Sequence, residues 1–136
     1  MNAEEIMTRE VSTVSESSTI GEALQIFASL EVRHLPVTRD GELVGMISDR
    51  DMRDAGLTIM ADMADMDRIR AMRGQPVSEI MRGDVITVDP TTPVPEIANL
   101  LVEEKIGAVP VVDEHDNTLV GLVSYVDILR AAADLL

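Results

Sequence analysis

The chain has 136 residues, of which 46% are apolar and 26% are charged, and its formal net charge is -14. This charge disfavours nucleic acid and anionic membrane surfaces as partners, because phosphate binding needs clustered Lys and Arg. The sequence has no cysteine, no apolar run of about 18 residues and no signal-peptide pattern, so we expect a cytoplasmic protein without disulfides or a membrane span.

The sequence contains an internal duplication, which is the main clue to its organisation. Ile6-Met7 aligns with Ile80-Met81, an offset of 74 residues. At this offset the identical pairs are Val11/Val85, Thr13/Thr87, Val14/Val88, Glu22/Glu96, Pro36/Pro110 and Val37/Val111. After a two-residue insertion near residues 115–116, Gly45, Ser48 and Asp51 recur as Gly121, Ser124 and Asp127. We therefore divide the chain into repeat 1 (residues 1–56), a linker (57–76) and repeat 2 (77–136).

Each repeat begins with a short apolar segment, residues 11–14 in repeat 1, followed by a polar turn. Thr19 and Glu22 form a capping-box pattern that opens a helix whose apolar residues fall at helical spacing. In repeat 2, Pro93 takes the place of the capping threonine, and its fixed φ suits a helix start.

Two strands are predicted next, at residues 35–38 and 43–47 in repeat 1 and at residues 109–112 and 119–123 in repeat 2. Asp40-Gly41 between the first two strands is a strong hairpin signal. A second helix follows each hairpin, the last from about residue 126 to the end. The fold class is therefore α+β, with two pseudo-symmetric β-α-β-β-α repeats that we expect to pack through their sheets. With one Phe and one Tyr, the core must consist of Val, Ile, Leu, Ala and Met.

The linker is rich in methionine, with an apolar residue at every third position. These residues are Met60, Met63, Met66, Ile69 and Met72. A spacing of three drifts around an α-helix, so a bent helical linker that packs against the body is one interpretation. Methionines also suit adaptable contact surfaces, and a partner or dimer contact is the other.

The strand-to-helix corner that contains Gly45, Ser48 and Asp51 recurs with Gly121, Ser124 and Asp127, and it allows two interpretations. In the structural one, serine and aspartate three residues apart form a capping box, and the glycine permits a close approach of strands. In the functional one, Ser48 donates to a phosphate and Asp51 accepts hydrogen bonds from the two hydroxyls of a ribose.

Local charge distinguishes the two corners. Arg33 and His34 precede the first strand of the hairpin in repeat 1, and Arg50 lies inside the corner. Repeat 2 has Gly107-Ala108 and Val126 at these positions. Because charges are screened over about 8 Å at physiological salt, a phosphate should prefer the corner with Arg50. The alternative to a role in phosphate binding is that Arg33 and His34 are ordinary surface residues. No cluster of Cys or His predicts a metal site, and no P-loop or GxSxG motif is present.

Together these stretches resemble the CBS (cystathionine β-synthase) domain, and the whole chain is similar to a tandem pair, or Bateman module, of the stand-alone bacterial type. The segments that carry the resemblance are Ile6-Met7-Thr8, residues 11–14, Arg33-His34-Leu35-Pro36-Val37 and residues 45–51, with their counterparts in repeat 2.

The resemblance implies a regulatory module that binds AMP, ADP, ATP or S-adenosylmethionine in two clefts between the repeats. It places adenine against Thr13-Val14 with Leu35-Pro36-Val37, and against Thr87-Val88 with Val109-Pro110-Val111. It assigns phosphate and ribose to Ser48 with Asp51 and to Ser124 with Asp127. It also implies a homodimer, a regulated partner protein that is not identified, and no required cofactor.

Two functions follow from these observations. The first is a ligand sensor that is not an enzyme and that controls a partner. The second is a structural or interaction dimer without a nucleotide ligand, in which both corners are only helix caps. Enzymatic activity has little support, because no pair of nucleophile and base is visible.

Overall fold

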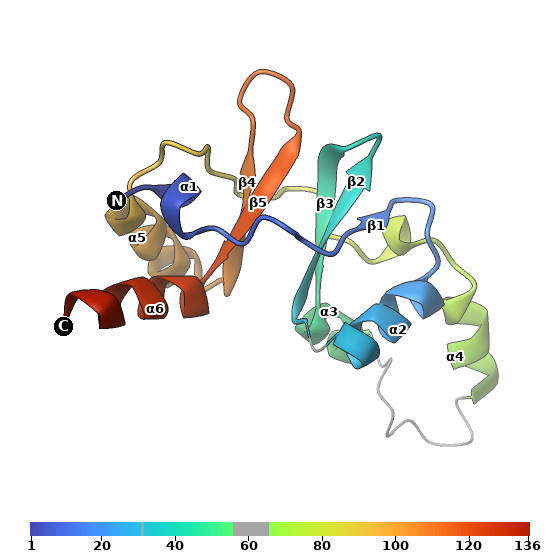
Figure 1. Cartoon of the computed structure of the whole chain (residues 1–136). Helices are drawn as coiled ribbons and strands as arrows, with labels where there is room; N and C mark the ends of the chain where they lie inside the picture. Colours follow the sequence, from blue (N-terminus) through green and yellow to red (C-terminus); the bar gives the residue numbers. More distant parts are fainter. Residues whose placement is uncertain (31, 56–65) are drawn as a thin grey trace. The chain divides into compact units, whose positions relative to one another are not determined.

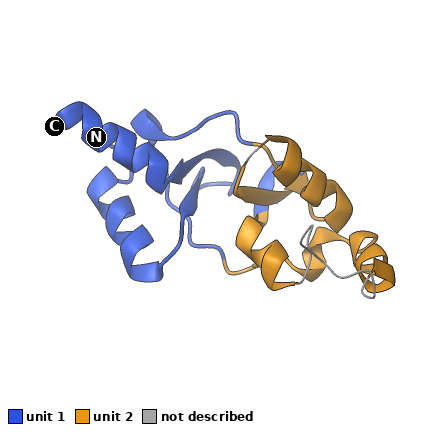
Figure 2. Cartoon of the chain, turned by 90° about the horizontal axis from the view of Figure 1, so that it is seen from below, with its two compact units in different colours: residues 1–11, 40–43, 85–136 blue, residues 12–39, 44–84 orange. Residues whose placement is uncertain are grey.

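The computed structural model describes residues 1–30, 32–55 and 66–136 (Figure 1). These residues form two compact units, and each unit has its own buried core. Unit 1 comprises residues 1–11, 40–43 and 85–136, and unit 2 comprises residues 12–39 and 44–84 (Figure 2). The start of repeat 1 (residues 1–11) therefore groups with most of repeat 2, and the start of repeat 2 (residues 77–84) groups with most of repeat 1.

Unit 2 carries a three-stranded sheet with strand order β1-β2-β3. Its elements are β1 (Val14–Ser15), α2 (Ile20–Leu30), β2 (His34–Arg39), β3 (Glu42–Ser48, of which 42–43 group with unit 1), α3 (Asp49–Asp54), α4 (Met66–Arg73) and the 3-10 helix η2 (Val77–Glu79). The Thr19 hydroxyl accepts the Glu22 N–H at 3.1 Å, which confirms the predicted start of α2. Asp40 and Gly41 both have positive φ, so the predicted hairpin turn is confirmed as well.

The core of unit 2 gathers residues from both helices and strands. Its buried members are Val14, Ile20, Ala23, Leu35, Val37, Ile47, Met52, Ile69 and Val77. Ile69 comes from α4, which packs against α2. The described part of the linker is therefore helical and packs on its unit, in accord with the first interpretation. Met60 and Met63 lie outside the described residues.

Unit 1 is built around an antiparallel pair of strands. Its elements are α1 (Ala3–Ile6), α5 (Val94–Glu104), β4 (Ala108–Val112), β5 (Leu119–Ser124) and α6 (Tyr125–Leu135). Helix α5 packs against β4 and α6, and α1 contacts both β5 and α6. The core again consists of aliphatic side chains, namely Ala3, Val88, Ile97, Leu101, Val109, Val111 and Val123.

The first strand of each repeat is shorter than the sequence predicted. In unit 2 only Val14 and Ser15 form β1, which runs parallel to β2 with Val14 opposite Val37. In unit 1 a single bridge joins Val88 to Val111. One residue later the Asp89 carboxylate accepts the Thr91 N–H at 2.7 Å, so the chain turns and the pairing does not extend beyond this bridge.

Candidate functional site

The two strand-to-helix corners have the same internal hydrogen bonding. We call residues 45–51 the unit 2 corner and residues 121–127 the unit 1 corner. Ser48 caps α3: its hydroxyl accepts the Asp51 N–H at 3.0 Å, and Asp51 Oδ2 accepts the Ser48 N–H at 2.8 Å. Ser124 and Asp127 repeat both bonds at 3.3 Å and 2.9 Å on α6. The capping interpretation of both corners is therefore confirmed, and both carboxylates already hold a helix end.

A second segment of chain covers the glycine of each corner. A β-carbon at Gly45 would lie 2.5 Å from the Met81 sulfur and 3.1 Å from the Arg82 carbonyl oxygen. At Gly121 it would lie 2.5 Å from the Met7 sulfur and 3.1 Å from the Thr8 carbonyl oxygen. Both glycines thus permit a close approach of backbone, as the structural interpretation expected.

The covering segments are the two Ile-Met stretches, and each is held by a pair of backbone hydrogen bonds. Met46 and Arg82 exchange N–H···O=C bonds of 3.0 and 2.9 Å across β3. Thr8 and Leu122 exchange bonds of 2.9 and 3.0 Å across β5. The Ile-Met stretch of repeat 2 therefore pairs with β3 of repeat 1, and the Ile-Met stretch of repeat 1 pairs with β5 of repeat 2.

In the unit 2 corner this arrangement brings Arg82 to Asp51. Both Nε and Nη2 of Arg82 lie 3.0 Å from Asp51 Oδ1. Sequence reasoning missed Arg82, although the repeat alignment places it one residue after Met81, where Thr8 stands after Met7. In the unit 1 corner the Thr8 hydroxyl lies 3.5 Å from Asp127 Oδ1, a much weaker contact.

The basic residues predicted for the unit 2 corner are Arg33, His34 and Arg50. The Arg33 carbonyl accepts the Asp49 N–H at 2.9 Å, so the start of β2 is tied to the corner and His34 lies near Asp51. Gly107 makes the equivalent bond to Tyr125 at 3.1 Å in unit 1. The side chains of Arg33 and Arg50 are exposed.

The residues predicted to contact adenine lie in the strands beside each corner or in the short segments that pair with them. The central residues of each hairpin strand, Leu35, Pro36, Val37, Val109, Pro110 and Val111, are buried, as are Val14 and Val88. Thr13 and Thr87 are exposed. The Val88 N–H donates to the Pro110 carbonyl at 3.1 Å, which places Thr87-Val88 beside the x-Pro-Val strand as predicted. The central side chains of these hairpin strands are buried in the core. A ligand could therefore contact only the backbone and the exposed edges of the strands.

Burial lowers the pKa of His34, and the positive charge of Arg33 acts in the same direction, whereas Asp51 and Asp49 raise it. The net direction is downward, so the unfolded chain takes up the proton first as the pH falls. The stability contributed by neutral His34 is complete above the unfolded pKa and is lost as the pH falls through the folded pKa.

We therefore expect the free energy of unfolding to decrease between about pH 7.5 and about pH 5.5, and to decrease less in His34→Gln. Urea titrations of both proteins at the two pH values measure this. The carboxylates with lowered pKa values, Glu16, Asp89 and Asp116, titrate below this window and should not mask the effect. Parallel pH profiles for the two proteins would contradict the assignment.

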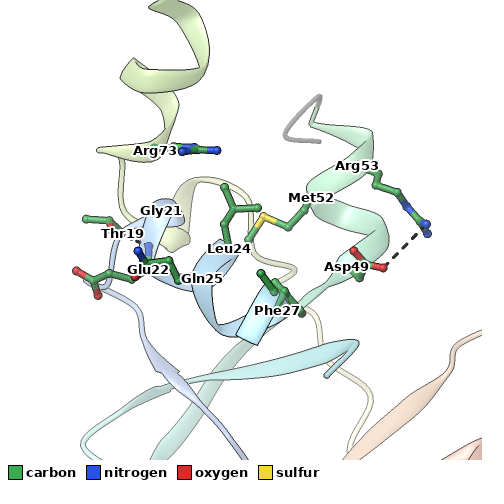
Figure 3. Close-up of a pocket in the computed structure, with 11 residues that line it drawn as sticks. Thr19, Gly21, Glu22, Leu24, Gln25, Phe27, Asp49, Met52, Arg53 and Arg73 are labelled. Carbon is green, nitrogen blue, oxygen red and sulfur yellow. Dashed lines mark hydrogen bonds and ion pairs between the residues drawn. The ribbon is translucent and has the colours of Figure 1, made fainter. Parts of the chain in front are cut away.

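Unit 2 also contains a cavity of 680 Å³ among α2, α3 and α4 (Figure 3). Leu24, Phe27 and Met52 supply its apolar wall, and Arg53 and Arg73 lie at its edge. Asp49, Met52 and Arg53 share one face of α3, and Asp51 lies on another. Asp49 is the one residue of the unit 2 corner that lines this cavity, and no predicted ligand-binding residue in the described ranges does so.

A cavity of 440 Å³ in unit 1 includes Thr87 and Val88. Its other lining residues include Asp89, Glu96, Asp113 and Glu114, which make it unfavourable for phosphate. In the part of the chain that the structure describes, no group of three His, Cys, Asp or Glu side chains is placed to hold a metal ion. None of the described helices is long and apolar enough to cross a membrane.

Comparison with known proteins gives a consistent result for both repeats. The family model for the CBS domain matches residues 3–58 and 77–134. The chain is 33% identical over 128 residues to the CBS domain-containing protein YhcV of Bacillus subtilis, covering 93% of this chain and 82% of YhcV.

Two solved structures match over nearly the whole chain. The CBS domain pair of protein MJ0100, in complex with 5'-methylthioadenosine and S-adenosyl-L-methionine, has a TM-score of 0.80 and 28% identity and covers 100% of this chain and 98% of that chain. CBSX2 in complex with AMP has a TM-score of 0.81 and 29% identity, covering 98% and 97%. The chain therefore belongs to the CBS domain family, with one CBS domain in each repeat.

Proposed function

We propose that this protein is a regulatory, non-catalytic module that binds an adenosine-containing ligand and signals its presence to a partner protein. The candidate ligands are AMP, ADP, ATP and S-adenosylmethionine. The observation that carries the proposal is the repeated corner, in which an aspartate carboxylate lies beside a capping serine, an edge strand and a second chain segment. CBSX2 and the MJ0100 pair are 29% and 28% identical to this chain, and both bind adenosine-containing ligands, which supports a ligand of the same class here.

The chemistry of each corner suits a nucleoside. Each carboxylate oxygen has two lone pairs, so Asp51 and Asp127 retain acceptor capacity for a ribose hydroxyl after their capping bonds are made. Ser48 and Ser124 have rotatable hydroxyls that can turn to a phosphate oxygen. Adenine would lie along the edges formed by Thr13-Val14 and Thr87-Val88, beside the x-Pro-Val strands.

The unit 2 corner is the first choice for a phosphate. Arg82 contacts Asp51, Arg50 lies inside the corner, and Arg33 and His34 lie at the start of β2, which the Arg33 carbonyl ties to Asp49. The equivalent positions in unit 1 are Gly107, Val126, Thr8 and Ala108, none of which is charged. Since the chain as a whole is strongly negative, these local cations decide where an anionic ligand binds.

Three further features belong to the same proposal. The chain divides into CBS repeat 1 (residues 1–56), a Met-rich linker (57–76) and CBS repeat 2 (77–136). The working form is a homodimer. The ligand acts as a regulatory signal, and no cofactor is required.

Isothermal titration with AMP, ADP, ATP and S-adenosylmethionine, together with thermal shift, tests the proposal. We expect saturable heat and an increased melting temperature with at least one of them, because a ligand that binds only the folded state stabilises it. The double variant Asp51→Ala/Asp127→Ala should lose the response. No heat and no thermal shift with any of the four ligands would contradict the proposal.

The completeness of both capping boxes favours one alternative. Serine and aspartate satisfy each other in both corners, so a structural role accounts for their presence without a ligand. A module of this kind would sediment as a stable dimer and would bind none of the four nucleotide ligands, so isothermal titration of the dimer with these ligands distinguishes it from a sensor.

A further inference from the structure

The residue that follows each Ile-Met stretch contacts the aspartate of a corner, and it differs between the repeats. In unit 2 it is Arg82, and in unit 1 it is Thr8. The backbones of the two residues are equivalent, since each exchanges a pair of hydrogen bonds with a corner strand. At this position the two corners therefore differ in the side chain and not in the backbone pairing.

Arg82 contacts the Asp51 oxygen, Oδ1, that would accept a hydrogen bond from a ribose hydroxyl. Its Nε and Nη2 both lie 3.0 Å from Oδ1, and Oδ2 already accepts the Ser48 N–H at 2.8 Å. Two N–H donors fill the two lone pairs of Oδ1. A ribose that binds Asp51 through both hydroxyls must therefore displace the guanidinium from Oδ1.

The displaced guanidinium remains in the site. The Arg82 backbone is fixed to Met46, but its side chain is 64% exposed, whereas the Asp51 side chain is 10% exposed. Rotation of the Arg82 side chain therefore costs little packing, and the carboxylate stays in place. A ligand with a phosphate gives the guanidinium a new anionic partner of suitable geometry, and a neutral nucleoside does not.

We infer that Arg82 makes the unit 2 corner selective for phosphorylated adenosine ligands by exchanging its Asp51 partner for the ligand phosphate. This inference rests on the proposed function, and it names the ligand class of each corner. In the unit 1 corner the Thr8 hydroxyl is 3.5 Å from Asp127 Oδ1 and is neutral, so a nucleoside without a phosphate displaces no ion pair there. The unit 1 corner accepts adenosine compounds with little regard to phosphate.

Site-resolved NMR titration tests this inference in the full chain. The amide signals of Ser48 and Ser124 report the two corners, because each amide donates to the aspartate that would change partner. AMP and adenosine are titrated separately into the wild type, Arg82→Thr and Thr8→Arg. Arg82→Lys retains the charge, and Arg68→Thr removes one exposed arginine from α4 as a control for net charge.

We expect AMP to be preferred over adenosine by about tenfold or more at Ser48 in the wild type, from the charge-assisted bonds to the phosphate. Arg82→Thr should reduce this preference to about threefold or less, both by weaker AMP binding and by stronger adenosine binding. Arg82→Lys and Arg68→Thr should retain most of it. Thr8→Arg should create a preference for AMP at Ser124.

The outcomes separate the inference from the function on which it rests. A wild type that binds neither AMP nor adenosine at either amide overturns the proposed function. A wild type that binds both, with an AMP preference at Ser48 that Arg82→Thr leaves unchanged, overturns only the role of Arg82. If Arg82→Thr does not fold, a Thr8→Arg variant without a new preference at Ser124 overturns the role as well.

Discussion

Asp51→Ala is expected to weaken AMP binding by about 10- to 100-fold, which corresponds to roughly 1.5–3 kcal/mol for hydrogen bonds to a charged acceptor. The Asp51 carboxylate is the group that would accept the ribose hydroxyls, and it is held in place by the Ser48 N–H and by α3. The loss of the carboxylate should leave Arg82 without a penalty for an unpaired charge, because its side chain is 64% exposed. Isothermal titration with AMP measures the change.

Asp127→Ala is the matched control for this variant. It removes the same capping box from α6 that Asp51→Ala removes from α3, so the structural damage to a helix start is comparable. Each lost cap should cost about 1 kcal/mol of stability. AMP affinity should fall less in Asp127→Ala, because the cations lie in unit 2. Equal losses of AMP affinity in the two variants would contradict the asymmetry between the corners.

Local charge predicts an asymmetry between the corners, and the structure adds one arginine, Arg82, that contacts Asp51. The basic residues that the sequence indicates, Arg33, His34 and Arg50, lie in the same repeat as Asp51. Arg82 is more than thirty residues from Asp51 along the chain, and only pairing of its segment with β3 brings it there. The repeat alignment already contained the signal, since Arg82 aligns with Thr8 at the offset of 74.

Local patterns predicted the helices and hairpins well because their causes are local. The Thr19 cap and the Asp40-Gly41 turn each depend on residues within a few positions, and both are present as expected. The first strand was overestimated because a strand needs a partner over several residues. β1 finds one over two residues, and Val88 over a single bridge.

The grouping of residues 1–11 with repeat 2 could not be derived from either repeat alone. A short Ile-Met stretch has no strong preference of its own, and its place depends on which strand leaves a gap for it. Gly121 provides that gap for Met7, and Gly45 provides it for Met81. The two glycines were recognised as permitting close approach, but the sequence did not say which segment approaches.

Gly45→Ala and Gly121→Ala are each expected to reduce the free energy of unfolding by about 1–3 kcal/mol, the usual cost of overpacking. The new methyl group would lie 2.5 Å from a methionine sulfur and 3.1 Å from a backbone carbonyl oxygen in both cases. The sulfur can move, but the Arg82 and Thr8 carbonyls are held by the paired hydrogen bonds to β3 and β5. Urea unfolding followed by circular dichroism measures the change.

Gly83→Ala is the control for these variants, since a methyl group there meets no heavy atom within 4 Å and its effect should stay within about 0.5 kcal/mol. Met81→Ala removes the sulfur that Gly45→Ala would strike. Part of the cost of Gly45→Ala should therefore disappear in the Met81→Ala background, which a double-mutant cycle detects as a coupling energy. A Gly45→Ala cost that is the same in both backgrounds would show that Met81 does not pack on this glycine. A Gly45→Ala variant as stable as Gly83→Ala would show that the Ile-Met stretch of repeat 2 does not lie on β3.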